Sequence, residues 1–285
     1  MKILTDKRCI IGEGPIWSEK EQKLYFTNGF GNEICTYDFT TDKVSVRALP
    51  FGISSFAFDI NNRLIISHEG GVHILNDSGS ISQIYDHTKF EIKHANDMKV
   101  GPDGAIYVGT QSEKRKGISD KIDGKLYRIS SDGSVRVLLD GLLLSNGMEW
   151  SIDETKFYHT DSDTQIIKEY SFDKASGAIT YSGRQIAVLG VDGFTIGKDG
   201  RLYVGCWGGG HIAVVDTSSL EICDYIDIPT QIPTSCSFCG ENMDILAITT
   251  ASFGADIKDD KNAGFTIVKK SKTVGRLPYL FGEIK

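Results

Sequence analysis

Short apolar runs alternate with polar turns along the chain, and six of these runs recur at a regular spacing. Their centres are separated by 40, 42, 51, 45 and 43 residues, an interval typical of four-stranded propeller blades. No apolar pattern at i, i+3, i+4 and i+7 is long enough to predict an amphipathic helix. The pattern therefore predicts an all-β chain of six units, with centres at Leu24, Leu64, Ile106, Phe157, Leu202 and Ile245.

Each unit repeats one order of strands and turns, which is clearest in the third unit. There the sequence predicts strands at 96–100, 105–109, 124–129 and 134–139, joined in part by turns at 101–104 and 131–133. Both turns contain Asp-Gly, a pair that accepts the positive φ angles of tight hairpin turns. The fifth unit repeats the arrangement with strands at 192–196, 202–205 and 211–216.

The segment from Lys2 to Ile10 precedes the first complete unit. We expect it to add a strand to the last blade and so close the ring, which limits the number of exposed sheet edges. The prediction is a single domain over residues 1–285, a six-bladed β-propeller with four-stranded blades. Two packed β-sandwiches, or a seven-bladed ring with one degenerate blade, are the alternatives.

A small polar or acidic residue stands ten or eleven positions before each strand centre. The start of a first strand and the end of an antiparallel second strand lie at the same rim, so we expect these residues to gather with the loops that follow the second strands. Two such loops, 111–123 and 251–263, are long and are candidates for shaping a pocket. The six residues are Glu13, Ser54, Asn96, Asn146, Asp192 and Thr234.

Four of these six residues could bind a cation through oxygen. Glu13 and Asp192 supply two negative charges, while Asn96 and Asn146 supply amide oxygens. Oxygen donors suit calcium, magnesium or manganese better than zinc, although open zinc sites also use them. The alternative for each residue alone is a turn cap, because Asn and Asp before a strand commonly bond to the nearby backbone.

Charge and cysteine content narrow the class of protein. The chain has 31 basic and 38 acidic residues, a formal charge of −7 and no basic stripe interleaved with aromatics, so we expect no nucleic-acid partner. The first ten residues lack the apolar stretch of a signal peptide, and no run approaches the ~20 apolar residues of a membrane span. The sequence predicts a soluble, cytoplasmic protein with free thiols, and Cys236 and Cys239 are expected to pack within a strand.

Five motifs spread along the chain resemble the gluconolactonase family, which includes the senescence marker protein and luciferin-regenerating enzyme. The resemblance implies a six-bladed propeller with one divalent metal ion held by Glu13, Asn146 and Asp192, and with substrate held near it by Asn96. Ser54 and Thr234 are then expected to be structural. The motifs are Gly12-Glu13-Gly14-Pro15-Ile16-Trp17, Asn96-Asp97, Ser145-Asn146-Gly147-Met148, Asp192-Gly193-Phe194 and Pro233-Thr234-Ser235.

The chain departs from the family at two positions. His94 stands two residues before Asn96, where many sugar lactonases carry Arg, and Val191 replaces a Pro often found before the metal-binding Asp. We expect His94 to be a hydrogen-bonding specificity residue. The alternative is a general base, because histidine titrates near neutral pH.

The resemblance implies a metal-dependent hydrolase that opens a sugar-acid lactone with metal-activated water. Asp192 would orient and deprotonate the water, while Asn96 and His94 position substrate hydroxyls. Calcium is the first candidate for the metal, with zinc, magnesium and manganese as alternatives. A related propeller hydrolase acting on aryl esters or organophosphates, or a non-catalytic propeller that binds a protein partner, are the rival functions. The sequence contains no Gly-x-Ser-x-Gly elbow and no phosphate-binding loop.

Overall fold

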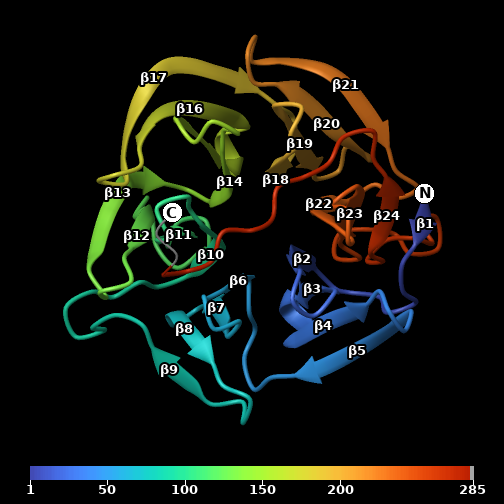
Figure 1. Cartoon of the computed structure of the whole chain (residues 1–285), viewed down its shortest axis with the longest axis horizontal. Helices are drawn as coiled ribbons and strands as arrows, with labels where there is room; N and C mark the ends of the chain where they lie inside the picture. Colours follow the sequence, from blue (N-terminus) through green and yellow to red (C-terminus); the bar gives the residue numbers. More distant parts are fainter. Residues whose placement is uncertain (283–285) are drawn as a thin grey trace. The chain divides into compact units, whose positions relative to one another are not determined.

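The computed structural model describes residues 1–282 and contains six four-stranded antiparallel sheets (Figure 1). Each sheet has the four-stranded make-up of a propeller blade, which confirms the predicted all-β, six-bladed β-propeller. Among residues 1–282 no α-helix forms, and two short 3-10 turns are present. The chain divides into two compact units, so the single domain stays a prediction and each unit is described by itself.

Unit 1 comprises Met1–Ile53 and Ile186–Pro278 and contains three sheets. The first has the order β2 (Gly12–Ser18), β3 (Lys23–Asn28), β4 (Glu33–Asp38) and β5 (Lys43–Ala48), with the 3-10 turn η1 (Gly29–Gly31) after β3. The second has the order β18 (Val191–Ile196), β19 (Arg201–Cys206), β20 (His211–Asp216) and β21 (Glu221–Asp227). The third consists of β22 (Pro233–Cys239), β23 (Ile245–Thr250), β24 (Ile267–Lys270) and β1 (Lys2–Ile3).

Unit 2 comprises Ser54–Gln185 and, among the described residues, 279–282. Its first sheet has the order β6 (Ser55–Phe58), β7 (Leu64–His68), β8 (Gly71–Leu75) and β9 (Ile81–Gln83). The second consists of β10 (Ala95–Val100), β11 (Ile106–Thr110), β12 (Gly124–Ile129) and β13 (Val135–Leu142). The third consists of β14 (Ser145–Trp150), β15 (Lys156–Asp161), β16 (Ile166–Asp173) and β17 (Ala178–Ala187), with η2 (Ser162–Thr164) after β15.

The N-terminal strand predicted for the last blade is present but short. Lys2 pairs with Val268 and Ile3 with Ile267, so that β1 forms the outer edge of the sheet that also contains β22 and β23. Further along, the backbone N–H of Cys9 donates to the carbonyl of Gly264 at 2.7 Å. The start of the chain therefore completes the last sheet, as the sequence predicts.

Turn chemistry explains where the second sheet of unit 2 reverses direction. Gly104 has a φ of +69°, a conformation that costs glycine little, and its N–H donates to the carbonyl of Gly101 at 2.9 Å. Asp103 then accepts hydrogen bonds from Tyr107 Oη at 2.9 Å and Arg128 Nε at 2.8 Å. The Asp-Gly turn thus also ties β11 to β12.

Large apolar side chains fill the interior of each unit. In unit 1, Trp17, Phe26 and Phe238 belong to one buried cluster. In unit 2, Trp150 and Phe157 are fully buried, with ring centroids 4.9 Å apart. Burying each such side chain stabilises the fold by roughly 1.5–3 kcal/mol. Several first and second strands are buried at every position, among them β6, β11, β14 and β18, so the inner part of these sheets is covered on both faces.

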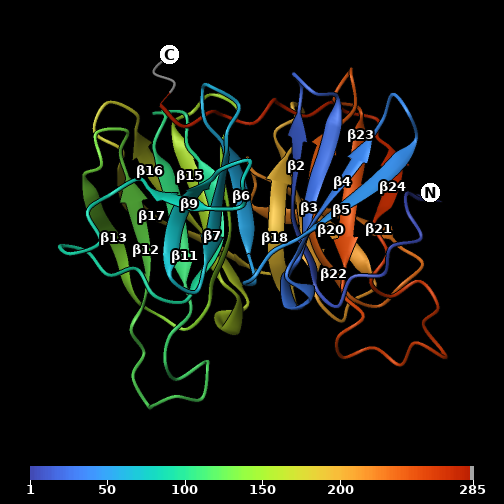
Figure 2. The ribbon, with the colours of Figure 1, turned by 90° about the horizontal axis from the view of Figure 1, so that it is seen from below.

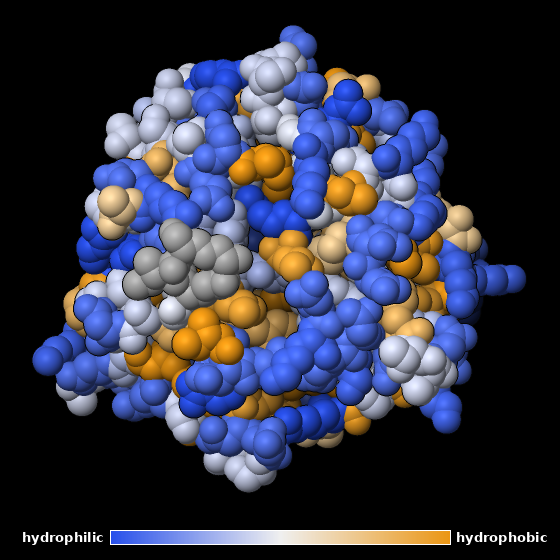
Figure 3. All heavy atoms as spheres, in the orientation of Figure 1, coloured by the Kyte–Doolittle hydropathy of each residue, from blue (hydrophilic) through white to orange (hydrophobic). Residues whose placement is uncertain are grey.

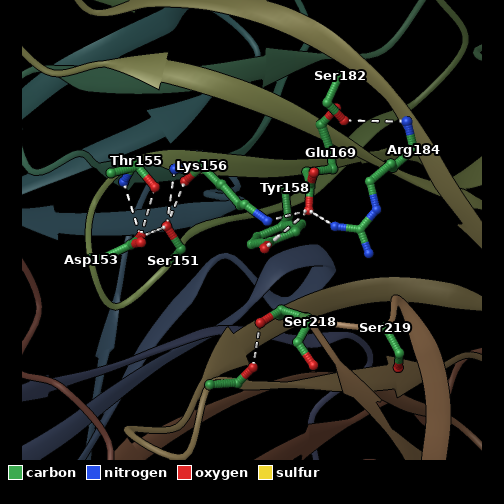
Figure 4. Close-up of polar contacts among 12 residues, drawn as sticks. Ser151, Asp153, Thr155, Lys156, Tyr158, Glu169, Ser182, Arg184, Ser218 and Ser219 are labelled. Carbon is green, nitrogen blue, oxygen red and sulfur yellow. Dashed lines mark hydrogen bonds and ion pairs between the residues drawn. The ribbon is translucent and has the colours of Figure 1, made fainter.

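A buried carboxylate joins β15, β16 and β17 of the last sheet in unit 2 (Figure 4). Glu169 on β16 has a side chain that is only 3% exposed. Its Oε2 accepts from Lys156 Nζ at 3.1 Å and from Arg184 Nη1 at 3.0 Å. A buried carboxylate is tolerated when it is paired and hydrogen-bonded, and Lys156 and Arg184 supply these partners.

All six cysteines are free thiols, as the sequence predicts. Cys236 and Cys239 are buried in β22. Polar side chains cover much of the visible surface, with apolar side chains scattered among them (Figure 3). Within residues 1–282, no helix is both long enough and apolar enough to cross a membrane.

Candidate active-site residues

Unit 1 carries Glu13, Thr234 and Asp192 near the starts of β2, β22 and β18. β22 packs against both β2 and β18, and Thr234 Oγ1 donates to the carbonyl of Gly12 at 2.5 Å. A Cβ added at Gly193 would lie 2.2 Å from Ser235 Oγ, so glycine allows β18 to approach β22 closely. Glu13 and Asp192 therefore stand on the two strands that flank β22.

The two carboxylates of unit 1 differ in exposure. Asp192 is buried, with 7% of its surface exposed, whereas Glu13 is half-buried. Glu13 Oε2 accepts a hydrogen bond from the N–H of Gly14 at 3.0 Å. The hydroxyl of Thr234 is occupied by backbone and by Thr249 Oγ1 at 2.9 Å, which fits the structural role expected for it.

Unit 2 brings Ser54, Asn96 and Asn146 to corresponding positions at β6, β10 and β14. Asn96 Nδ2 donates to the carbonyl of Ser145 at 3.2 Å, so Asn96 lies beside the residue that precedes Asn146. Ser54 Oγ donates to the carbonyl of Ala95 at 3.1 Å, a structural contact as expected. The three residues found by counting back from the strand centres thus lie at or beside the starts of β6, β10 and β14, and β10 contacts both of the other two strands.

A β-bulge accompanies the recurring polar position in five of the six first strands. The pairing register shifts at this point in β2, β10, β14, β18 and β22. In the paired residues of β6 the register is regular. A bulge bends a strand and redirects the side chains around it. In these five strands the polar residue therefore lies at the register shift, and the regular pairing of the strand begins after it.

Backbone and side-chain contacts hold Asn96 and Ser145 in place. Ser67 Oγ donates to the Asn96 carbonyl at 2.7 Å, and Gln111 Nε2 donates to Asn96 Oδ1 at 3.3 Å. Ser145 Oγ lies 2.7 Å from His159 Nε2. Burial lowers the pKa of His159 to about 3, so its imidazole is neutral at physiological pH and bonds Ser145 as a neutral group.

His94 precedes β10 and adopts a left-handed backbone conformation, with a φ of +56°. Its N–H donates to the carbonyl of Glu69 at 3.0 Å, and its carbonyl accepts from the N–H of Gln111 at 2.9 Å. The side chain is 19% exposed, and Nδ1 lies 2.5 Å from Glu69 Oε2. His94 is thus held by both its backbone and its ring.

Glu69 lies between β7 and β8 and contacts Lys116 as well as His94. Although partial burial favours the neutral acid, the hydrogen bonds from Lys116 and His94 lower the pKa of Glu69 below its usual value. The carboxylate is therefore ionised at neutral pH. Neither the spacing nor the motifs pointed to Lys116 or to the side chain of Gln111.

The long loop 111–123 extends past the strand ends of its sheet in unit 2 (Figure 2). Lys116 binds Glu69 in the β7–β8 turn, while Arg115 Nε donates to Asp163 Oδ1 in η2 at 3.1 Å. Consecutive residues therefore fasten this loop to the rim loops of the two flanking sheets.

The second long loop, 251–263, is anchored within unit 1. Asp260 Oδ2 accepts from Thr230 Oγ1 at 2.8 Å and from the N–H of Gln231 at 2.7 Å. Near its start, Phe253 packs edge-on against Phe30 with ring centroids 5.6 Å apart, although both side chains are more than half exposed.

The donor set proposed for a metal consists of oxygen atoms, two carboxylates and one amide. Within residues 1–282, no three His, Cys, Asp or Glu side chains gather closely enough to hold a metal by themselves. A site would therefore need the amide oxygen of Asn146, and this combination suits a hard cation such as calcium. Glu13 and Asp192 belong to unit 1 and Asn146 to unit 2, so their joint ligation is a proposal.

A groove of about 590 Å³ lies elsewhere in unit 2. It is lined by residues 83–86, Lys89, Phe90 and residues 132–134. None of the predicted site residues belongs to this lining, so the groove is not a candidate for the site.

Known proteins are similar to this chain in sequence and in fold. The sequence model of the SMP-30/Gluconolactonase/LRE-like region matches residues 11–252. A Bacillus subtilis protein named "Putative sugar lactone lactonase YvrE" is 31% identical over 259 residues, which cover 87% of this chain and 86% of that protein. Pentonolactonase XacC from Haloferax volcanii is 27% identical over 264 residues, with coverages of 89% and 86%.

A solved structure shows the same fold. It is a regucalcin from Agrobacterium tumefaciens, described as a calcium-binding protein, with a TM-score of 0.86 and 21% identity. The likeness covers 99% of this chain and 97% of that chain.

Proposed function

Because the chain belongs to the SMP-30/gluconolactonase/LRE-like family, we propose that it is a divalent-metal-dependent hydrolase that opens a sugar-acid lactone. The relatives named as lactonases support a lactone-hydrolysing enzyme. One observation carries the residue assignment: Glu13, Asn146 and Asp192 recur at the bulged starts of three first strands. A bulge at an equivalent point is a feature often found beside active sites.

Glu13, Asn146 and Asp192 hold one divalent ion in this proposal. Two carboxylates balance the charge of the ion, and all three donors are oxygen atoms, which favours calcium. The calcium-binding description of the Agrobacterium regucalcin supports the same choice. Magnesium, manganese and zinc are the alternatives that a metal analysis has to compare.

The ion, when bound, supplies Lewis-acid stabilisation of negative charge that develops on oxygen. Asp192 orients the attacking water and accepts a proton from it. Asn96 and His94 hold hydroxyl groups of the lactone, which fixes the carbonyl carbon for attack. The water oxygen bonds to that carbon, the ring C–O bond breaks, and the departing ring oxygen takes up a proton to become a hydroxyl.

Metal analysis and a lactone assay on the same preparation test this function. Protein purified without added metal is assayed with a pH indicator on aldonolactones, aryl esters and phosphotriesters, with and without chelator. We expect the aldonolactones to be the best substrates and the chelator to abolish their hydrolysis. A preference for aryl esters or phosphotriesters would instead favour a related propeller hydrolase. Protein without metal and without gain from calcium, magnesium, manganese or zinc would favour a non-catalytic propeller.

Substitution of Asp192 tests the residue assignment. Asp192→Ala should lower both metal content and lactone hydrolysis, the latter by about 100-fold or more because a ligand and a base are lost together. Thr234→Ser is the matched control, since Thr234 stands at the corresponding position of β22 and its hydroxyl is retained. Near-normal metal content and hydrolysis in Asp192→Ala would sink the assignment.

A further inference from the structure

Glu69 holds two basic side chains at the rim of unit 2. Its Oε2 lies 2.5 Å from His94 Nδ1, and its Oε1 binds Lys116 Nζ. Its carbonyl also accepts the backbone N–H of His94 at 3.0 Å. One residue therefore fixes both the backbone and the ring of His94.

The conformation of His94 is one that residues other than glycine adopt infrequently. The φ of +56° is maintained by two backbone hydrogen bonds, to Glu69 on one side and from Gln111 on the other. Residues in such conformations persist where their surroundings over-determine them, often at functional sites. Gln111 also donates to Asn96 Oδ1, so the residue proposed to hold substrate shares this framework.

The contact with Glu69 decides which ring nitrogen of His94 faces the carboxylate. Nδ1 lies 2.5 Å from Glu69 Oε2, and an ionised carboxylate can only accept, so Nδ1 is the donor. With Nδ1–H donating to Glu69, the proton-free nitrogen is Nε2, which then accepts hydrogen bonds.

We propose that Glu69 and Lys116 fix His94 as a hydrogen-bond acceptor at Nε2, which selects lactones that present a donating hydroxyl there. The inference rests on the proposed function, in which His94 touches substrate. Glu69 acts through His94 and is therefore a positioning residue.

Lys116 extends the arrangement to the loop 111–123. Because Arg115 binds Asp163 on the opposite side, the loop is held at two points and delivers Lys116 to Glu69 in a fixed geometry. Releasing Lys116 removes one of the two side-chain hydrogen bonds that orient the Glu69 carboxylate. The position of His94 Nδ1 is then less tightly fixed.

Tautomer and kinetics together test the inference. Imidazole ¹⁵N shifts report which ring nitrogen of His94 carries the proton, and kinetics compare aldonolactones with their deoxy analogues. We expect an Nδ1–H tautomer in the wild type and a shift toward Nε2–H in Glu69→Ala. KM for the hydroxylated lactone should rise about 10-fold with kcat changed less than about threefold, because a binding contact made in both ground and transition states is lost.

Lys116→Met removes one of the two hydrogen bonds that orient Glu69, so it should raise KM for the hydroxylated lactone in the same direction as Glu69→Ala, and Lys121→Met is its control. Lys121 lies on the same loop, has a side chain that is 70% exposed and pairs with Glu113 at 3.7 Å, so its removal should leave tautomer and KM unchanged. A wild-type Nε2–H tautomer, or identical spectra and KM in Glu69→Ala, would overturn the inference. Wild-type protein that hydrolyses no lactone contradicts the proposed function instead, and the tautomer then decides alone whether Glu69 fixes His94.

Discussion

Acid should destabilise unit 2 through His159, which is 2% exposed on β15. Burial, followed by the positive charge of Lys168, lowers its pKa to about 3, whereas an unfolded histidine titrates near ~6.5. The folded state therefore keeps a neutral ring at pH 5 while the unfolded state binds a proton. Stability is complete above pH ~6.5 and is lost as the pH falls, until the folded ring also protonates.

The size of this loss at pH 5 follows from linkage and amounts to about 2 kcal/mol. It depends mainly on the unfolded-state pKa, because a folded-state pKa anywhere below ~4 leaves the ring neutral at pH 5. His159→Gln retains a polar partner for Ser145 Oγ, which lies 2.7 Å from the ring, and removes the titration. The variant should therefore lose about 2 kcal/mol less than the wild type between pH 8 and pH 5.

Urea unfolding followed by tryptophan fluorescence measures the difference, because Trp150 is buried in the same sheet. His211→Gln is the matched control, since His211 is only half-buried, in unit 1; it should follow the wild type. The reasoning is refuted if His159→Gln loses as much stability on acidification as the wild type does. A difference in unfolding free energy between variant and wild type at pH 8 does not affect this test, because only the change between pH 8 and pH 5 is compared.

Three further predictions concern single substitutions. Glu169→Ala should lower the free energy of unfolding by about 3 kcal/mol, because two cations lose their buried partner; urea unfolding with an unchanged midpoint would contradict the pairing. Gly193→Ala should lower the free energy of unfolding by about 1–3 kcal/mol, because the added Cβ would lie 2.2 Å from Ser235 Oγ. Gly29→Ala is the control, because its added Cβ has its nearest contact at 3.6 Å, and it should lower the thermal unfolding midpoint less than Gly193→Ala does. His94→Arg should exchange an acceptor for a donor and so reduce the rate advantage of hydroxylated lactones over deoxy analogues, and an unaltered ratio in competition kinetics would argue against a specificity role.

Periodicity and turn chemistry sufficed for the fold because both are local. The predicted strand at 124–129 coincides with β12, and the strand at 211–216 coincides with β20. The N-terminal strand followed from counting the units, although only two of its predicted residues pair as a strand. Strand ends elsewhere shift by one to three residues, as in the strand predicted at 134–139 and observed as β13 (Val135–Leu142), since they depend on the partner strand as well as on the turn.

The site could be predicted only as far as it repeats. Counting back from strand centres found Asn96 and Asn146. In the structure Asn96 Nδ2 donates to the carbonyl of Ser145, the residue before Asn146. The bulges escaped the sequence because a register shift depends on residues across the strand pair. The Glu69 contacts escaped it because they join residues 25 and 47 positions apart, through a loop whose path no local pattern determines.

The most direct test of the central claim is metal-dependent recovery of lactone hydrolysis in chelator-treated protein. Wild-type protein stripped of metal should be inactive toward an aldonolactone and should regain hydrolysis on addition of one equivalent of calcium per chain. Asp192→Ala, treated in the same way, should regain none. Full hydrolysis by the stripped wild type, or equal recovery in Asp192→Ala, would contradict a divalent-metal lactonase built on Glu13, Asn146 and Asp192.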